Sequence, residues 1–208
     1  MSSSYLPRKD NLVRKYIMKQ NKNYRLIQTV ALIGLMGSGK TTLGRHFAKN
    51  ISVDFVDSDE EIVTRAGISI PEIFELSGEA KFRDIEQRVI ADILTRKPSI
   101  LSTGGGAFIS AQTREILHNK STTIWLRAKP ETLISRMDNL HTRPLLAAGD
   151  PVLTLTTLSN ERRSFYEKAD IIIDTDTLSS AQALHKLAAA LEERNVLIEE
   201  TQSDEESK

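Results

Sequence analysis

Cysteine is absent from this 208-residue chain, which excludes a disulfide scaffold, a thiolate zinc site and a catalytic thiol. Net charge is absent as well, because 28 Lys and Arg residues balance 28 Asp and Glu residues. The protein therefore has no overall field that would hold nucleic acid or an anionic membrane. No apolar run approaches the roughly 20 residues that span a bilayer, so we exclude a membrane protein. The composition that remains is globular, and the length suits one domain.

The two ends of the chain are nevertheless charged in opposite senses. Residues 1–25 carry seven Lys or Arg residues against the single acid Asp10. This stretch fits a nucleic-acid-binding arm, an organelle-targeting peptide or a solvated extension, and we favour the extension. Residues 199–208 are acidic and are interpreted as a solvated terminus. We therefore place the working domain at residues 26–198, and we expect a cytoplasmic monomer that binds neither nucleic acid nor a membrane.

Between the ends, apolar segments alternate with longer helical patterns. Strands are predicted at Ile27–Leu35, Val53–Val56, Ser99–Ser102, Thr122–Leu126 and Ile171–Ile173. Helices are predicted at Lys40–Asn50, Ser58–Arg65, Gly78–Arg96, Ala111–Asn119, Pro130–Met137, Val152–Lys168 and Ser179–Arg194. Short apolar strands separated by helices are typical of a parallel sheet that is covered on both faces. The predicted fold class is α/β, a doubly wound parallel five-stranded sheet flanked by helices.

The segment Gly34–Thr41 matches the phosphate-binding loop pattern G-x-x-x-x-G-K-[ST], and it stands between a predicted strand and a predicted helix, as that loop must. Glycines let backbone N–H groups and the helix N-terminus approach phosphate oxygens. Lys40 would reach the β- and γ-phosphates, and the Thr41 hydroxyl would bind Mg²⁺. The alternative is a chance glycine turn, which the flanking strand and helix disfavour. The predicted ATP-binding residues of this loop are Gly37, Ser38, Gly39, Lys40, Thr41 and Thr42.

A phosphate-binding loop does not say what is done with the nucleotide. The Asn-Lys-x-Asp segment with which GTPases read guanine is absent, which favours ATP. Residues 26–198 show no basic or aromatic surface for nucleic acid, which disfavours a helicase. A small-molecule kinase and an ATP-binding module that transfers nothing both remain open.

Two aspartates, Asp57 and Asp59, follow the next predicted strand. At the carboxyl end of a strand beside the P-loop strand, they lie where doubly wound sheets bind ligands. One of them would serve the magnesium shell, and the other would meet an acceptor hydroxyl. The alternative is a helix N-cap, which Asp57 or Ser58 could supply alone.

Two further segments have both a structural and a functional interpretation. Arg83 is spaced for ion pairs with Glu79 and Glu86 along a helix, as in a surface ladder. Gly104–Gly106 follow a short strand, where they either bring bare backbone close to another group or form a flexible turn. The residues alone leave these alternatives open.

Taken together, the motifs resemble those of the shikimate kinases. That family shows, in order, a P-loop, Asp-x-Asp, Ser-Ile-x-x-Ile-Phe, Gly-Glu-x-x-Phe-Arg-x-x-Glu, Gly-Gly-Gly, Arg-Pro-Leu-Leu and Arg-x-x-x-Tyr. The matching blocks here are Gly34–Thr41, Asp57/Asp59, Ser69–Phe74, Gly78–Glu86, Gly104–Gly106, Arg143–Leu146 and Arg162/Tyr166. The resemblance implies a P-loop NTPase fold like that of the nucleoside monophosphate kinases. It also implies transfer of the γ-phosphoryl group of ATP to the 3-hydroxyl of shikimate, a step of chorismate and aromatic amino-acid biosynthesis.

The resemblance further implies roles on the acceptor side. Arg83 and Arg162 would bind the shikimate carboxylate, a task suited to the planar guanidinium group. Asp59 would hold ring hydroxyls and act as a base, and the Gly105 N–H would contact the substrate. The implied substrate-binding residues are Asp59, Arg83, Gly104, Gly105, Gly106 and Arg162.

On the ATP side, the resemblance assigns one Mg²⁺ ion to Thr41 and Asp57. Residues 139–151 match the family's mobile lid, from which Arg143 would reach the ATP phosphates on closure. Such closure keeps water from competing for the γ-phosphoryl group. Arg136 matches an arginine near the adenine and phosphates. The implied catalytic residues are Lys40, Asp59 and Arg143, and Arg136 and Arg143 join the ATP-binding set.

One stretch departs from the family. Many members place an Arg or Gln against the adenine after the last strand, where residues 174–179 read Asp-Thr-Asp-Thr-Leu-Ser, so this contact stays open. The histidines are scattered and are assigned no catalytic role: His46, His118, His141 and His185. A gluconate-type kinase would share the P-loop but need not carry Arg83 and the Gly104–Gly106 turn. A non-transferring regulator would be expected to lose an acceptor-side residue.

Overall fold

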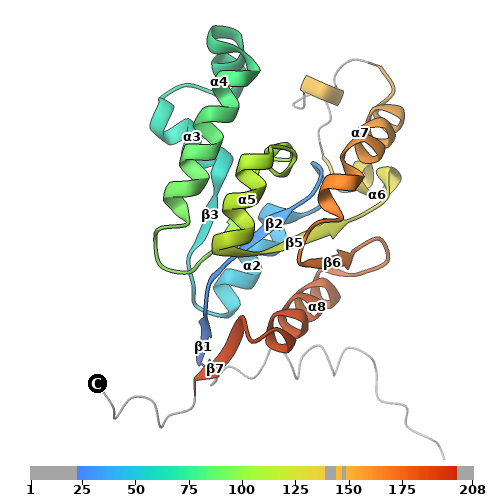
Figure 1. Cartoon of the computed structure of the whole chain (residues 1–208). Coiled ribbons are helices and arrows are strands. Elements are labelled where there is room, and N and C mark those ends of the chain that lie inside the picture. Colours follow the sequence, from blue (N-terminus) through green and yellow to red (C-terminus); the bar gives the residue numbers. More distant parts are fainter. Residues whose placement is uncertain (1–22, 139–143, 147–148, 201–208) are drawn as a thin grey trace, which may run out of the picture.

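A parallel five-stranded sheet forms the centre of the computed structural model, which describes residues 23–138, 144–146 and 149–200 (Figure 1). Its strand order is β3-β4-β2-β5-β6. The strands are β2 (Thr29–Ile33), β3 (Phe55–Asp57), β4 (Ile100–Ser102), β5 (Ser121–Arg127) and β6 (Ile171–Asp174). Every pair in this sheet is parallel. The predicted fold class is confirmed, and each predicted strand overlaps an observed one.

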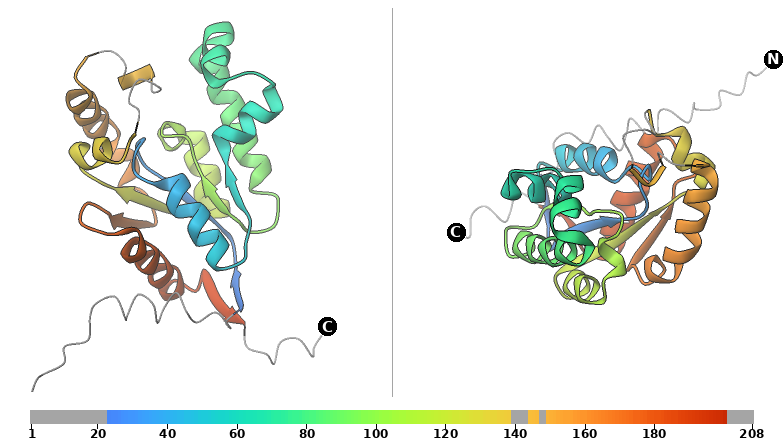
Figure 2. Two further views of the ribbon diagram at one scale, coloured as in Figure 1. Left: turned by 180° about the vertical axis from the view of Figure 1, so that it is seen from behind. Right: turned by 90° about the horizontal axis from the view of Figure 1, so that it is seen from above.

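Helices cover both faces of the sheet (Figure 2). Side chains of β2 alternate between the two faces, so that Ala31 and Ile33 join one buried cluster and Val30 and Leu32 join the other. The first cluster includes residues of α3 (Ser58–Ala66), α4 (Ile70–Ile93), α5 (Ala111–Lys120), α6 (Pro130–Ser135) and α7 (Pro151–Tyr166). The second includes residues of α2 (Lys40–Asn50) and α8 (Ser180–Glu193). Burial on both faces explains the apolar run Val30–Ile33 of the central strand β2.

Helix α4 begins earlier than the sequence analysis predicted. Ser69 and Glu72 form a capping box at its start, in which each side chain accepts the other residue's backbone N–H, and Pro71 occupies the first turn. Gly78 interrupts the helix with φ 74° and ψ 171°, a conformation that favours glycine. The predicted helix Gly78–Arg96 corresponds to the segment after this kink. The segment before it was missed.

A second, two-stranded sheet joins the ends of the described chain. Strand β1 (Asn23–Leu26) pairs antiparallel with β7 (Leu197–Glu200), with Asn23 opposite Glu200. Leu26 and Leu197 are buried in the cluster beneath α2 and α8. The predicted boundaries at residues 26 and 198 therefore fall inside this sheet, because the pairing continues outward from the two buried leucines. Figures 1 and 2 place the ribbon at the opposite end of the molecule from the first turns of α4.

Two short 3₁₀ helices complete the elements, η1 (Ala107–Ile109) and η3 (Pro144–Leu146). The predicted lid, residues 139–151, lies partly outside the described residues, because 139–143 and 147–148 are not among them. Helix η3 belongs to this segment, and its Leu146 is buried in the cluster beneath α4 and α7. Among the described helices, none is long and apolar enough to cross a membrane.

Candidate active site

The predicted phosphate loop joins β2 to α2 at the carboxyl edge of the sheet. Gly37 has φ 76°, and a Cβ atom there would stand 2.6 Å from the Leu133 carbonyl oxygen, so a side chain is excluded by both strain and space. Gly39 precedes α2 with φ 90°, and no side chain caps this helix. The first N–H groups of α2 therefore stay available to an anion. The ammonium of Lys40 donates to the carbonyls of Gly34 and Leu35 at 2.9 and 3.0 Å, which holds it against the loop.

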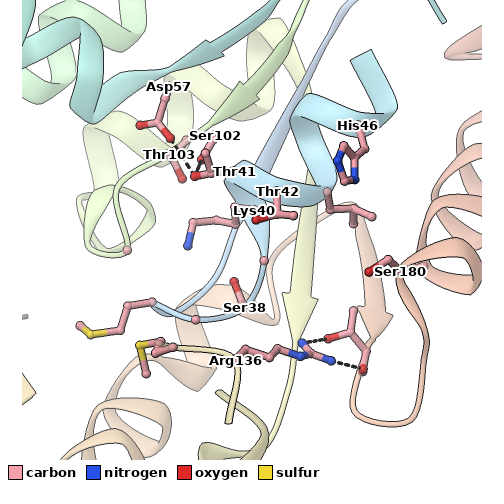
Figure 3. A pocket seen from close by; sticks show the side chains of 18 of the residues that line it. Ser38, Lys40, Thr41, Thr42, His46, Asp57, Ser102, Thr103, Arg136 and Ser180 are labelled. Atoms are coloured by element: carbon pink, nitrogen blue, oxygen red, sulfur yellow. Dashed lines mark hydrogen bonds between the residues drawn. The ribbon is translucent and has the colours of Figure 1, made fainter. Parts of the chain in front are cut away.

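Three oxygen-bearing side chains meet beside this loop, as Figure 3 shows. The Thr41 hydroxyl donates to Asp57 Oδ2 at 2.9 Å and lies 3.3 Å from the Ser102 hydroxyl. The other carboxylate oxygen of Asp57 accepts the Asp59 N–H at 3.0 Å and caps α3. Asp57 thus satisfies the helix-cap interpretation and still faces Thr41. Hard oxygen donors of this kind are the ligands that Mg²⁺ prefers.

The described residues hold no cluster of three or more His, Cys, Asp or Glu side chains that would bind a metal without a further partner. An ion at Thr41 and Asp57 would therefore need oxygens from elsewhere. Mg²⁺ usually keeps several waters and takes substrate phosphate oxygens besides one or two carboxylates. The donor set of this chain fits such an ion.

Asp59 lies where α3 meets the glycine turn. A Cβ atom on Gly104 would stand 2.7 Å from Asp59 Oδ1 and 2.7 Å from Glu86 Oε1. Only a glycine fits at this position, because the turn lies against both carboxyl groups. The buried Ser58 hydroxyl accepts the Gly104 N–H at 3.1 Å. The residue between the two predicted aspartates therefore anchors the turn, a role that sequence analysis missed.

The Gly105 peptide faces two ways. Its carbonyl accepts a hydrogen bond from Arg162 Nη1 at 3.1 Å and another from the Tyr166 hydroxyl at 2.5 Å. No described residue accepts the Gly105 N–H, and Gly105 lines the cavity. The N–H thus stays available to an acceptor molecule. Tyr166 is buried, and that burial raises the pKa of its hydroxyl, so Tyr166 donates as the neutral phenol.

Arg83 lies on the other side of the same turn. It pairs with Glu86 at 2.8 Å and with Glu79 at 3.1 Å, so the ion-pair ladder that the spacing allowed does form. A Cβ atom on Gly106 would clash with the Arg83 guanidinium at 2.5 Å. Bare backbone at this position thus lets the guanidinium lie against the turn. The structural and the functional interpretation of Arg83 are compatible.

Glu86 is a buried carboxyl group of this site, with 1% of its surface exposed. Burial raises the pKa of Glu86, and the Arg83 hydrogen bond and charge oppose that shift, while the neighbouring Asp59 charge adds to it. The helical spacing predicted only an ion pair with Arg83 for Glu86. Its position beside Asp59 depends on α3, α4 and the glycine turn together, and no local pattern indicates it.

Arg136 ends α6 and reaches the loop after β6. Its guanidinium donates to the Thr175 hydroxyl at 3.0 Å and to the Thr175 carbonyl at 2.5 Å (Figure 3). Thr175 belongs to residues 174–179, the stretch that departs from the family pattern, so Arg136 binds both the side chain and the backbone of that stretch. His46 and Ser180 line the same end of the cavity from α2 and α8.

One cavity of about 690 Å³ connects these parts. The phosphate loop lines its middle, Asp59 and Gly105 line one end, and Arg136, Thr175 and Ser180 line the other. Arg83 and Arg162 flank the glycine turn outside this lining. Of the predicted site residues that the structure describes, those of the P-loop line the cavity together with Asp57, Asp59, Gly105 and Arg136, whereas Gly104 and Gly106 do not. Arg143, the predicted lid arginine, lies outside the described residues.

The strand order of the parallel sheet and the P-loop between β2 and α2 define the fold class of the P-loop nucleotide-binding kinases. Within that class, residues 36–192 match the family model for shikimate kinase, and the chain belongs to the shikimate kinase family.

Individual relatives agree with this assignment. A shikimate kinase of Ruegeria pomeroyi is 43% identical over 175 residues, which cover 84% of this chain and 90% of the relative. The solved structure of an Acinetobacter baumannii shikimate kinase in complex with shikimate aligns with a TM-score of 0.76 at 34% identity, covering 81% of this chain and 95% of the other. A Sinorhizobium meliloti gluconokinase shares the fold, with a TM-score of 0.50 at 19% identity, over 82% of this chain and 98% of the other.

Proposed function

We propose that this chain transfers the γ-phosphoryl group of ATP to the 3-hydroxyl of shikimate, giving shikimate 3-phosphate and ADP. Membership of the shikimate kinase family supports an ATP-dependent phosphotransferase that uses shikimate. The observation that carries the residue-level proposal is the single cavity in which the phosphate loop lies between Asp59 and Gly105 at one end and Arg136 at the other.

On the ATP side, the phosphates lie against the uncapped N-terminus of α2 and the P-loop backbone, with Lys40 supplying positive charge. Thr41 and Asp57 would hold Mg²⁺, which neutralises phosphate charge when bound. Arg136 fixes the loop after β6 and borders the nucleotide. Arg143 adds charge from the lid in this proposal, as the family resemblance implies.

On the acceptor side, Arg83 and Arg162 bind the shikimate carboxylate from the two sides of the glycine turn. Asp59 orients the nucleophilic hydroxyl and accepts its proton, and the Gly105 N–H donates to the substrate. Phosphoryl transfer asks the protein mainly for in-line positioning and charge neutralisation, and this arrangement supplies both.

A coupled assay of ADP release, with and without shikimate, tests the proposal. We expect release that depends on shikimate and on Mg²⁺, and no activation by gluconate. Release with gluconate but not with shikimate would replace this function by that of the related sugar-acid kinases. Nucleotide binding without any shikimate-dependent release would indicate a module that transfers nothing.

The expectation of a cytoplasmic monomer stays a prediction from the sequence. Light scattering on the full chain, with and without ATP, would test the oligomeric state.

A further inference from the structure

Arg114 lies on α5, outside the cavity lining, yet it contacts the segment that continues directly from the glycine turn. Its Nη1 donates to the carbonyls of Phe108 and Ile109 at 2.8 and 3.0 Å. These are the last two residues of η1, where helix carbonyls lack intrahelical partners. The guanidinium also lies over two rings, 6.0 Å from the centre of Phe108 and 5.3 Å from that of Phe165 on α7. One side chain thus joins η1 to α5 and α7.

The position of η1 determines that of the glycine turn. The Ala107 N–H donates to the Gly104 carbonyl and the Ile109 N–H to the Gly106 carbonyl, each at 3.1 Å. The turn and η1 therefore form one hydrogen-bonded unit of six residues. Tyr166 of α7 binds this unit at the Gly105 carbonyl, in the glycine turn. Arg114 binds it at the other end, at the last carbonyls of η1, and its guanidinium packs on Phe165 of α7.

Arg114 differs from the surface arginines of this chain. Within the described part of the chain, no carboxylate lies at ion-pair distance from it, whereas Arg163 on α7 pairs with Glu167 at 2.7 Å. Arg114 instead binds two carbonyl oxygens and stacks on aromatic rings at once. A planar guanidinium with several donors can do this, and an ammonium cannot do it fully.

We propose that Arg114 is a positioning residue for the acceptor: it holds η1 so that the Gly105 N–H and the Arg162 guanidinium keep the geometry in which they receive shikimate. This inference rests on the proposed function. Without Arg114, η1 would keep its buried Ala107 and Phe108 but lose the two hydrogen bonds to its last carbonyls, and the shikimate side would lose alignment. Among the described residues, the P-loop, α2 and Arg136 make no contact with Arg114, so nucleotide binding should be spared.

The test compares Arg114→Met with the parent in steady-state kinetics. Methionine keeps an unbranched side chain over the rings and removes every donor. We expect the KM for shikimate to rise about tenfold, since small misplacements of substrate-positioning groups are costly. The KM for ATP should stay within about twofold. Arg114→Lys keeps a cation with a single donor nitrogen but no planar group to stack on the rings, so it should recover part of the loss. Arg163→Met, which removes an exposed arginine of α7, is the matched control and should behave as the parent.

The outcomes separate the possibilities. A shikimate KM within about twofold of the parent value, or equal rises in both KM values, would overturn the positioning role. If Arg114→Met fails to fold by circular dichroism, Arg114→Lys is judged by the same comparison of the two KM values, supported by calorimetric affinities for shikimate and for ADP. A parent enzyme that ignores shikimate refutes the proposed function itself, and that result is seen before any variant is made.

Discussion

At the scale of single residues, Thr41 shows how one hydroxyl serves both structure and proposed chemistry. It bonds Asp57 and lies near Ser102, and in the proposed function it also binds Mg²⁺. Thr41→Val preserves shape and removes the hydroxyl, so we expect a folded protein that has lost most of its turnover. Thr41→Ser keeps the hydroxyl and should keep activity. The measurement is shikimate-dependent ADP release across a magnesium titration, and full activity of Thr41→Val would refute the magnesium assignment.

Arg162 offers a test of what the substrate carboxylate contributes. Charge-assisted hydrogen bonds are worth about 1.5–3 kcal/mol, so Arg162→Lys should lower kcat/KM for shikimate roughly tenfold or more. ATP affinity should hardly change. A shikimate analogue with a neutral group in place of the carboxylate is the control, and the lysine penalty should largely vanish with it. An equal penalty for both compounds would mean that Arg162 acts through its bond to the Gly105 carbonyl instead.

Glu86 should make the stability of the protein depend on pH. Because burial raises its pKa above the ordinary value of 4.5, the folded protein binds this proton more tightly than the unfolded chain does. Its contribution to stability is therefore present below pH 4.5 and is lost as pH rises through the raised pKa. The side chain of Glu86→Gln does not titrate. As pH rises from 4.5 through the raised pKa of Glu86, the melting temperature of the parent should therefore fall relative to that of the variant.

The control for Glu86 is Glu79→Gln, which removes the exposed partner of the same arginine. It should follow the parent's pH dependence. A constant difference in melting temperature between parent and Glu86→Gln at every pH would show that Glu86 does not titrate there.

At the scale of elements, α3 is tied to the end of α4 by four charges. Glu61 accepts from Arg96 and Arg65, and Asp92 accepts from the same two arginines. These bonds lower the pKa values of both carboxyl groups, so the stability they give is present at neutral pH and is lost as pH falls. Arg65, Asp92 and Arg96 are exposed and Glu61 is half-buried, so salt screens these ion pairs.

Removing one member of this network should therefore have a small effect. We expect Arg96→Gln to lower the melting temperature by about 1–2 °C at low salt and neutral pH. The difference from the parent should shrink in 1 M salt, where the Debye length is about 3 Å. A salt-independent loss would indicate that packing of the Arg96 side chain, and not its charge, is responsible.

Elements differed in how well the sequence indicated them. Helix α2 was predicted with its observed bounds because the P-loop determines where it begins. The first segment of α4 was missed although Ser69, Pro71 and Glu72 form a recognisable helix start, because Gly78 looked like the beginning of the helix. In the site, the P-loop could be predicted from local sequence. The close approach of Asp59 and Glu86 to Gly104 could not be predicted from the sequence, because α3, α4 and the glycine turn bring these residues together.

At the scale of the whole molecule, the β1–β7 ribbon joins the two ends of the described chain. Leu26 and Leu197 are buried in the core and Tyr24 packs against it, whereas Arg25, Glu199 and Glu200 are exposed. Removing residues 1–22 should leave kcat and both KM values within about twofold of the parent values. Removing residues 1–26 also deletes β1, and loss of the buried Leu26 should lower the free energy of unfolding by about 1.5–3 kcal/mol.

Chemical denaturation of the two truncated proteins distinguishes these cases. Equal stability of both would mean that β1 contributes nothing to the fold. A tenfold loss of activity on removing residues 1–22 alone would show that this stretch acts on the site or on an active assembly.

The same ribbon bears on how the protein can be handled. Asn23 and Glu200 lie opposite each other in an antiparallel pair, at the end of the molecule away from the first turns of α4. A linker of a few residues could join them as a hairpin does, because such pairs are closed by short turns. The polypeptide could then be made circular and opened at another surface loop. Attachment to a solid support near either residue would likewise leave the opposite end of the molecule facing the solution.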